Sequence, residues 1–308
     1  MASEYLIAAA VMGGMGILLA LILAIADKRL WVYEDPRIDE VEALLPKANC
    51  GACGQAGCRA FAEKCVKGEI APGRCTVNTP EGIVSIASLL KVEAGGEEKR
   101  VARVACAGGS NVALRRADYK GLQSCRAAAL VSGGAKACTW GCLGLADCAQ
   151  VCSFGAIRMD EHDLPVVDEA KCTACGDCVE ICPKQLFTLH PVSHRLWVSC
   201  RNLLENQFAE DACAVACTGC GRCALVAPAL ITMVNNLPLI DYTKNSKATR
   251  DPIERCPTGA IVWIDPIEGP FKGFGAKKIT RKSPLPVEEA DLPLQAADAA
   301  QARELRIS

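Results

Sequence analysis

The stretch Cys172-Thr-Ala-Cys175-Gly-Asp-Cys178-Val-Glu-Ile-Cys182-Pro183 carries four cysteines separated by two, two and three residues and ends on a proline. Two-residue spacing lets one loop offer three thiolates to three corners of a four-iron, four-sulfide cube, and the fourth cysteine then ligates a neighbouring cube. Cysteines two residues apart also build zinc sites with four thiolate ligands. A run of four cysteines closed by Cys-Pro is far more specific than such pairs, and it predicts [4Fe-4S] clusters.

A fold with two clusters needs a partner run upstream, and four further cysteines supply it at positions 138, 142, 148 and 152. Two of its three spacings differ from the commonest form, and Ser153 replaces the usual proline. Crossed ligation, in which the last cysteine of each run serves the other cluster, predicts two groups of ligands. The first group is Cys138, Cys142, Cys148 and Cys182, and the second is Cys152, Cys172, Cys175 and Cys178.

An internal repeat extends this pattern toward the C-terminus. Residues 164–172 match residues 237–245, and residues 152–157 match residues 256–261. Each copy consists of a short Cys-rich loop and helix followed by a short β-rich stretch. The repeat therefore predicts two tandem bacterial ferredoxin-like units.

The second unit is degenerate in a way that supports crossed ligation. One cluster would need a cysteine at position 227, where Ala227 stands, and three more around residues 245–252, where none is found. The other cluster keeps all its ligands, so one cluster is interpreted as lost whole and one as kept whole. The retained ligands are Cys217, Cys220, Cys223 and Cys256.

A third cysteine pattern lies nearer the N-terminus, in the stretch NCGACGQAGC that begins at Asn49. Three glycines between its cysteines allow the tight backbone approach that a cube needs. Cys65 falls within a helix expected after these cysteines, and we interpret it as a buried thiol, with a cluster ligand as the alternative. A second helix is expected from Thr79 to Val92, with Thr79 as its cap. The predicted ligands of this module are Cys50, Cys53, Cys58 and Cys75.

Four cysteines remain outside these groups, in two pairs that flank the ferredoxin-like units: Cys106, Cys125, Cys200 and Cys213. Four [4Fe-4S] clusters are predicted from the other groups, and a fifth cluster held by these four cysteines is the favoured interpretation. The alternatives are free thiols or a different grouping, for instance one in which Cys213 replaces Cys217 as a ligand.

An uncharged segment runs from Tyr5 to Ala26 and would span roughly 33 Å as a helix, about one hydrocarbon core. Asp27, Lys28 and Arg29 follow it, so the positive-inside bias places the C-terminal bulk in the cytoplasm. A cleaved signal peptide is the alternative, but the run is long and its positive charge is on the wrong side. Because cytoplasmic thiols stay reduced, the 21 cysteines are expected to be metal ligands and not disulfides.

Charge and motif content exclude several function classes. With 34 basic and 35 acidic residues, the net charge of −1 argues against nucleic acid as the main partner. No G-x-G-x-x-G follows a predicted strand and no Walker A motif occurs, so no site for NAD, flavin or ATP is predicted. The only histidines, His162, His190 and His194, lie beside no nucleophile pattern and are expected to be solvated or structural. No catalytic residue is predicted.

The predicted fold class is α+β, with a single N-terminal transmembrane helix, a small Fe-S module and tandem bacterial ferredoxin-like units. The tail is expected to be extended or disordered, with an arm docked on a partner as the alternative. In order, the predicted domains are the anchor 1–27, the Fe-S module 34–92, the two-cluster unit with its leading segment 101–199, the one-cluster unit 200–268 and the tail 269–308.

The order of these features resembles the B subunit of the Rnf electron transport complex, in its longer form with an additional ferredoxin-like unit. The resemblance covers residues 5–264. It rests on a membrane helix followed by CGACGQAGC, then YKG, CTWGCLGLADC and CTACGDCVEICPK. It implies that the cysteines named above ligate clusters, and that the partners are soluble ferredoxin and other membrane subunits of an Rnf-like complex.

What the resemblance implies for function is an electron-transfer subunit with no substrate chemistry of its own. The complex would sit in the cytoplasmic (inner) membrane, reduce NAD and move Na⁺ or H⁺. One alternative is a membrane-tethered relay of another redox complex, such as a 2-oxoacid:ferredoxin oxidoreductase. The other is a non-redox zinc protein or a regulatory iron-sulfur protein.

Overall fold

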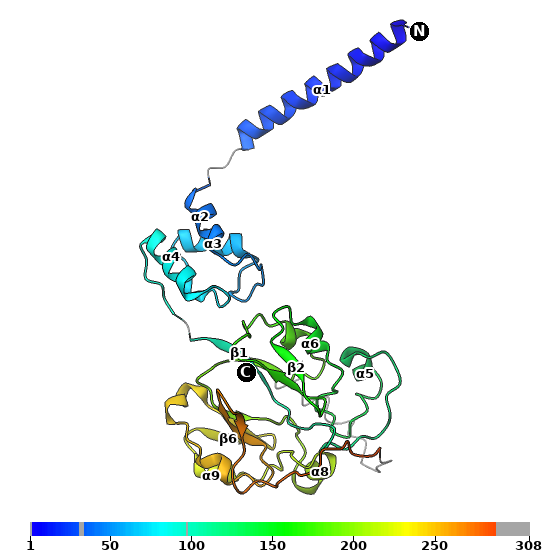
Figure 1. The fold of residues 1–308 in the computed structure, drawn as a ribbon, viewed down its shortest axis with the longest axis vertical. Coiled ribbons are helices and arrows are strands. Elements are labelled where there is room, and N and C mark those ends of the chain that lie inside the picture. Colours follow the sequence, from blue (N-terminus) through cyan, green and yellow to red (C-terminus); the bar gives the residue numbers. More distant parts are fainter. Residues whose placement is uncertain (1, 31–33, 97, 288–308) are drawn as a thin grey trace. The chain divides into compact units, whose positions relative to one another are not determined.

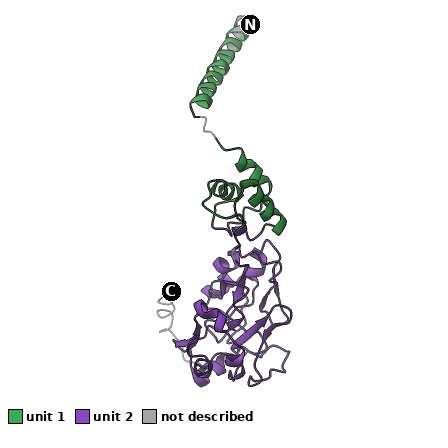
Figure 2. Ribbon diagram, turned by 90° about the vertical axis from the view of Figure 1, so that its left-hand side faces the viewer, with its two compact units in different colours: residues 1–49, 55–72, 78–95 green, residues 50–54, 73–77, 96–308 purple. Residues whose placement is uncertain are grey.

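The computed structural model describes residues 2–30, 34–96 and 98–287. By its internal contacts the chain divides into two compact units, which are coloured separately in Figure 2. Unit 1 comprises residues 1–49, 55–72 and 78–95, and unit 2 comprises residues 50–54, 73–77 and 96–308.

Unit 1 begins with the long apolar helix α1, Ala2–Leu30 (Figure 1). Its stretch Ala9–Leu30 has a mean hydropathy of 2.5 and is not buried inside the protein. Among the described residues it is the one helix long and apolar enough to cross a membrane, and it contains most of the span predicted from the sequence. Lys28 and Arg29 lie in its last turn, where cations interact favourably with the helix dipole.

Shorter helices follow: α2 Arg37–Ala43, α3 Cys58–Val66, the 3-10 turn η1 Pro72–Arg74 and α4 Pro80–Leu90. α2 packs against α3, and Val41 and Phe61 are 0% and 1% exposed. The predicted cap of α4 is confirmed, because Thr79 Oγ1 accepts a hydrogen bond from the Gly82 N–H at 3.1 Å. Cys65 is buried, as predicted.

Unit 2 is built from short antiparallel strands and short helices (Figure 1). Its strand pairs are β1 Arg100–Val104 with β4 Phe187–Pro191, β2 Ile157–Met159 with β3 Pro165–Val167, and β6 Ile231–Val234 with β7 Leu237–Ile240. A three-stranded sheet has the order β5 Leu196–Val198, β8 Ile261–Asp265 and β9 Gly269–Phe271. The helices are α5 Cys125–Leu130, α6 Asp147–Val151, α7 Asp177–Ile181, α8 Asn206–Ala212, α9 Arg222–Val226, the 3-10 helix η2 Tyr242–Lys247 and α10 Asp251–Glu254.

The elements of unit 2 repeat in the same order. The leading strand β1 is followed by α5, α6, the hairpin β2–β3, α7 and the closing strand β4, which pairs with β1. The second half has the order β5, α8, α9, the hairpin β6–β7, η2, α10 and β8, and β8 pairs with β5. Val104 lies opposite Phe187, and Val198 correspondingly lies opposite Ile261. The two tandem ferredoxin-like units expected from the repeat are therefore confirmed.

Each half of unit 2 has its own small apolar core, and cysteines belong to it. In the first half, Val101 and Phe187 pack with Cys172 and Cys178. In the second half, Leu196, Leu230, Ile231, Ile253 and Ile261 pack with Cys217, Cys223 and Cys256. Strands of three to five residues bury little apolar surface, so groups held by these cysteines would form part of each core.

Two features of the structure bear on the predicted organisation, which stays a prediction. The boundary placed between residues 199 and 200 separates β5 from its partner β8, so the second half already begins at β5. The described part of the tail is docked on unit 2: the Leu285 N–H donates to Ser110 O at 2.8 Å, and Asn111 Nδ2 donates to Arg281 O at 2.9 Å. The rest of the predicted tail lies outside the described residues.

Candidate functional site

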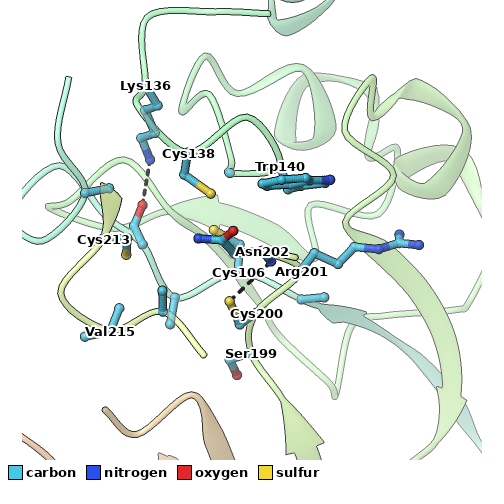
Figure 3. Close-up of a pocket in the computed structure, with 16 residues that line it drawn as sticks. Cys106, Lys136, Cys138, Trp140, Ser199, Cys200, Arg201, Asn202, Cys213 and Val215 are labelled. Carbon is cyan, nitrogen blue, oxygen red and sulfur yellow. Dashed lines mark hydrogen bonds between the residues drawn. The ribbon is translucent and has the colours of Figure 1, made fainter. Parts of the chain in front are cut away.

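Four cysteines from distant parts of unit 2 line one pocket, shown in Figure 3. Two of them occupy the same place in the two halves, because Cys106 lies two residues after β1 and Cys200 two residues after β5. The other two come from connections, Cys138 beyond α5 and Cys213 directly after α8. We call this set the central quartet: Cys106, Cys138, Cys200 and Cys213.

Backbone N–H groups point at the sulfurs of the central quartet. The Cys142 N–H donates to Cys106 Sγ at 3.4 Å, and Cys200 Sγ accepts from the N–H groups of Asn202 at 3.4 Å and Cys217 at 3.3 Å. Such bonds stabilise negative charge on sulfur. Burial opposes them and raises the pKa of Cys200 to about 11. Because metals bind thiolates, iron would supply the positive charge that this buried donor set needs.

Glycines leave room for such a group. A Cβ atom on Gly108 would lie 3.0 Å from Cys213 Sγ and 3.7 Å from Cys106 Sγ. A Cβ atom on Gly141 would lie 3.6 Å from Cys138 Sγ. Any side chain at Gly108 would therefore press on a candidate ligand. The donor set and the space around it fit a [4Fe-4S] cluster.

A second pocket is lined by four other cysteines, together with Val104 and Phe187. We call them the first flanking quartet: Cys125, Cys142, Cys148 and Cys182. Ser124 Oγ and the Arg126 N–H both donate to Asp147 Oδ2, at 2.9 Å and 3.1 Å. These bonds fix the first turn of α5 and with it the position of Cys125.

The membership of this pocket corrects the sequence prediction. The sequence prediction grouped Cys138 with Cys142, Cys148 and Cys182, and it left Cys125 for a fifth cluster. In the structure Cys125 lines this pocket and Cys138 lines the central pocket. Leu145 stands where the second half has Cys220, so the loop before α6 offers two thiols instead of three. The remaining sulfur comes from α5, a segment that loop spacing does not reveal.

A third pocket is lined by the set predicted from the degenerate repeat, the second flanking quartet: Cys217, Cys220, Cys223 and Cys256. Burial raises the pKa of Cys223 to about 11 and of Cys217 to about 12. Cys220 is the exposed member, and it is the one exposed cysteine of the 21, all of which lie in the described part of the chain.

The last predicted set in unit 2, the outer quartet, is Cys152, Cys172, Cys175 and Cys178. The thiol of Cys178 interacts electrostatically with the other three, and burial raises its pKa to about 12. The Ala102 N–H donates to Cys172 Sγ at 3.4 Å, and the Ala156 N–H donates to Cys152 Sγ at 3.3 Å. Cys178 also interacts with Cys148 of the first flanking quartet, so the assignment of the outer quartet to one cluster stays a prediction.

Cysteines at matching positions of the two halves take part in matching quartets, and the sequence already shows this match. Residues 138–148 and 213–223 both carry cysteine at their first, fifth and eleventh positions. In each stretch the first cysteine turns to the central quartet, and the fifth and eleventh turn to a flanking quartet. Aligning these stretches would have paired Cys138 with Cys213. The alternative in which Cys213 replaces Cys217 is not observed.

The cysteines of the N-terminal module are divided between the units. Cys58 opens α3 in unit 1, where its N–H donates to Asn49 Oδ1 at 2.8 Å. The other three, Cys50, Cys53 and Cys75, belong to unit 2. Their grouping around one cluster stays a prediction from the sequence.

Within residues 2–30, 34–96 and 98–287, no three His, Cys, Asp or Glu side chains converge where one metal ion could bind.

The histidines lie apart from these sites. His190 Nδ1 lies 3.1 Å from His194 Nδ1, and the His194 ring stacks on Tyr242 with ring centroids 4.0 Å apart. Burial lowers the pKa of His190 to about 4, so this imidazole is neutral at pH 7. These contacts indicate a structural role for the pair.

Two protein-family models match the chain. A family described as an Fe-S cluster matches residues 45–77, and a 4Fe-4S binding domain matches residues 164–187. The first match covers the cysteines of the N-terminal module, and the second covers three cysteines of the outer quartet.

Several curated relatives resemble most of the chain. The B subunit of the Na(+)-translocating ferredoxin:NAD(+) oxidoreductase complex of Acetobacterium woodii is 41% identical over 262 residues, which is 85% of this chain and 78% of the relative. The B subunit of the proton-translocating ferredoxin:NAD(+) oxidoreductase complex of Clostridium ljungdahlii is 39% identical over 82% of this chain and 90% of the relative. The B subunit of the ion-translocating oxidoreductase complex of Methanosarcina acetivorans is 37% identical over 85% of this chain and 99% of the relative.

Proposed function

This chain belongs to the family of the B subunits of ion-translocating ferredoxin:NAD(+) oxidoreductase (Rnf) complexes, and on that premise we propose that it is a membrane-anchored iron-sulfur electron relay. It passes low-potential electrons between soluble ferredoxin and the membrane subunits of a complex that reduces NAD and moves Na⁺ or H⁺. The chain performs no substrate chemistry. Its residues hold the carriers, space them and tune them.

The observation that carries this proposal is the continuity of the four quartets of unit 2. Cys142 of the first flanking quartet donates its N–H to Cys106 Sγ, and Cys217 of the second flanking quartet makes the equivalent bond to Cys200 Sγ. At the other end, Cys148 packs in one core with Cys152, Cys172 and Cys178 of the outer quartet. The order is therefore outer, first flanking, central and second flanking.

Each [4Fe-4S] cluster supplies a one-electron carrier when it is bound. The chain's own part is electrostatic and steric. Thiolates fix each carrier, backbone N–H groups stabilise the charge on their sulfurs, and apolar side chains such as Phe187 and Ile261 exclude water. Burial and hydrogen bonding of this kind set the potential of such sites.

Five clusters are proposed in total, four in unit 2 and one held by Cys50, Cys53, Cys58 and Cys75. The family model that matches residues 45–77 supports the cluster of the N-terminal module. Cys65 is left outside all five sets.

The second flanking quartet is the proposed contact site for soluble ferredoxin. It lies at one end of the order, and Cys220 offers an exposed ligand to a partner's carrier. Leu225 and Val226 on the adjacent helix α9 are 81% and 39% exposed, so an apolar contact surface borders the site.

The cluster-bearing part is proposed to face the cytoplasm. Lys28 and Arg29 at the end of α1 support this orientation through the positive-inside bias. Protease treatment of membrane vesicles tests it: the units after α1 should be digested in inside-out vesicles and protected in right-side-out vesicles. Protection in the inside-out vesicles alone would reverse the assignment.

Metal analysis of the anaerobically purified chain tests the relay. We expect about 20 irons with equal acid-labile sulfide, at four irons per cluster, and rapid bleaching of the clusters by reduced ferredoxin. A content of about 16 irons would mean that one of the five proposed clusters is absent. Zinc without sulfide would overturn the proposal. Replacement of Cys200 by alanine should remove about four irons, whereas the matched control Cys65→Ala should remove none.

A relay for a 2-oxoacid:ferredoxin oxidoreductase is the second candidate. Purification from membranes separates the two, because the Rnf assignment requires integral membrane subunits to copurify with this chain.

A further inference from the structure

A lysine lies in the central pocket without a carboxylate partner. Lys136 is 8% exposed, and its Nζ donates to Gly108 O at 2.6 Å (Figure 3). In the described part of the chain it forms no ion pair with Asp or Glu, and its electrostatic partners are the thiols of Cys142 and Cys213. A buried ammonium group normally needs a negative partner.

Two further lysines each interact with cysteines of two quartets; Lys184 lines the pocket of the first flanking quartet, and Lys272 is an exposed residue. Lys184 interacts electrostatically with Cys138 of the central quartet and Cys182 of the first flanking quartet, and its Nζ donates to Thr139 O at 2.7 Å. Lys272 interacts in the same way with the equivalent cysteines of the second half. Those cysteines are Cys213 and Cys256. Neither lysine pairs with a carboxylate among the described residues.

The lysines are unevenly distributed over the quartets. The central quartet is next to all three, the first flanking quartet to two, the second flanking quartet to one and the outer quartet to none. At the position corresponding to Lys136, the second half has Asp211, an exposed residue that accepts a hydrogen bond from Gln207. Arg201 also lines the central pocket, but its guanidinium points away and donates to Gln185 O (Figure 3).

Positive charge beside a thiolate-ligated cluster favours the reduced state, because reduction adds negative charge to the cluster. We propose that Lys136, Lys184 and Lys272 are the counter-charges of the clusters, and that they give the central cluster the highest reduction potential of the four in unit 2. An electron on the relay then rests at the central site between transfers. This inference depends on the proposed clusters.

The test is a redox titration of the full-length protein, followed by electron paramagnetic resonance, for Lys136→Met, Lys184→Met and Lys272→Met. Methionine keeps most of the side-chain volume and removes the charge. We expect one shared midpoint to fall in all three variants, by at least tenfold in the one-electron equilibrium constant, or 59 mV. In Lys184→Met the midpoint of the first flanking cluster should fall as well. In Lys272→Met the midpoint of the second flanking cluster should fall instead.

Two controls separate charge from structure. Lys136→Arg keeps the charge and should retain the wild-type midpoints, and Lys120→Met removes an exposed lysine and should leave every midpoint unchanged. Should Lys136→Met fail to load iron, the other two variants decide, because neither Lys184 nor Lys272 is fully buried.

Iron content separates failure of this inference from failure of the proposed function. Full iron with no midpoint shared by the variants would overturn the role of the lysines and leave the relay intact. Absence of iron and sulfide from the wild-type chain would overturn both.

Discussion

The substitution Gly108→Ala probes the central quartet at its tightest point. The added Cβ would lie 3.0 Å from Cys213 Sγ, whereas non-bonded carbon contacts are most favourable at about 3.5–4.0 Å. The sulfur or the backbone must therefore move by roughly 0.5 Å. Glycine is required here for space alone, because Gly108 is not among the glycines with positive φ.

Overpacking of this kind costs about 1–3 kcal/mol. If that cost falls on the cluster-bound state, the affinity for the cluster drops by about five-fold to 150-fold, at 1.4 kcal/mol per factor of ten. We expect the purified variant to lose up to about four of about 20 irons. Iron and sulfide analysis with redox titration measures this, and Gly96→Ala is the matched control, since its Cβ would meet nothing within 4 Å.

The reasoning is refuted if Gly108→Ala keeps its full iron and all its midpoints, as Gly96→Ala should. Loss of iron in both variants would show that the effect does not come from contact with the ligands.

The other predictions follow from single contacts. Cys106→Ala and Cys138→Ala should each remove about four irons, and the double variant should remove no more, because both residues belong to the central quartet; a loss of about eight would restore the grouping expected from spacing. Leu225→Glu should slow reduction by ferredoxin but not by dithionite in stopped-flow experiments, whereas Leu122→Glu, at a comparably exposed site, should slow neither. Thr79→Ala removes the N-cap of α4 and should lower the free energy of unfolding of its unit by about 1 kcal/mol, measured by urea denaturation, and an unchanged midpoint would contradict the capping role.

Local patterns predicted the local features correctly. The apolar run before Lys28 gives α1, and Thr79 caps α4. The Cys-x2-Cys-x2-Cys loop of the second flanking quartet lines one pocket with Cys256, and three thiols on one short loop reach only one cluster.

The sequence assigned cysteines to the wrong quartet where the quartet combines cysteines from separate segments of the chain. Sequence spacing left Cys125 and Cys138 in exchanged positions, because the distance between two sulfurs then depends on how α5 packs against the loop before α6. The contacts of the tail likewise depend on packing between distant segments. The segment around Leu285 has no periodic apolar pattern. The Leu285 N–H donates to Ser110 O, which lies far away in the chain.

The sequence by itself determined the kinds of element and chemistry in this protein: an apolar helix, a tandem repeat and thiols in cluster-forming runs. Tertiary structure alone decided that the two halves share the central quartet, and with it the order of the relay. The physical reason is that a cluster held by four thiols from four segments needs β1 and β5 to bring their following residues, Cys106 and Cys200, to one pocket. Backbone hydrogen bonds between the halves, such as that from the Ala107 N–H to Ser199 O at 3.0 Å, hold these segments together. The matching cysteine positions in residues 138–148 and 213–223 pair Cys138 with Cys213, but they do not reveal that Cys106 and Cys200 join them.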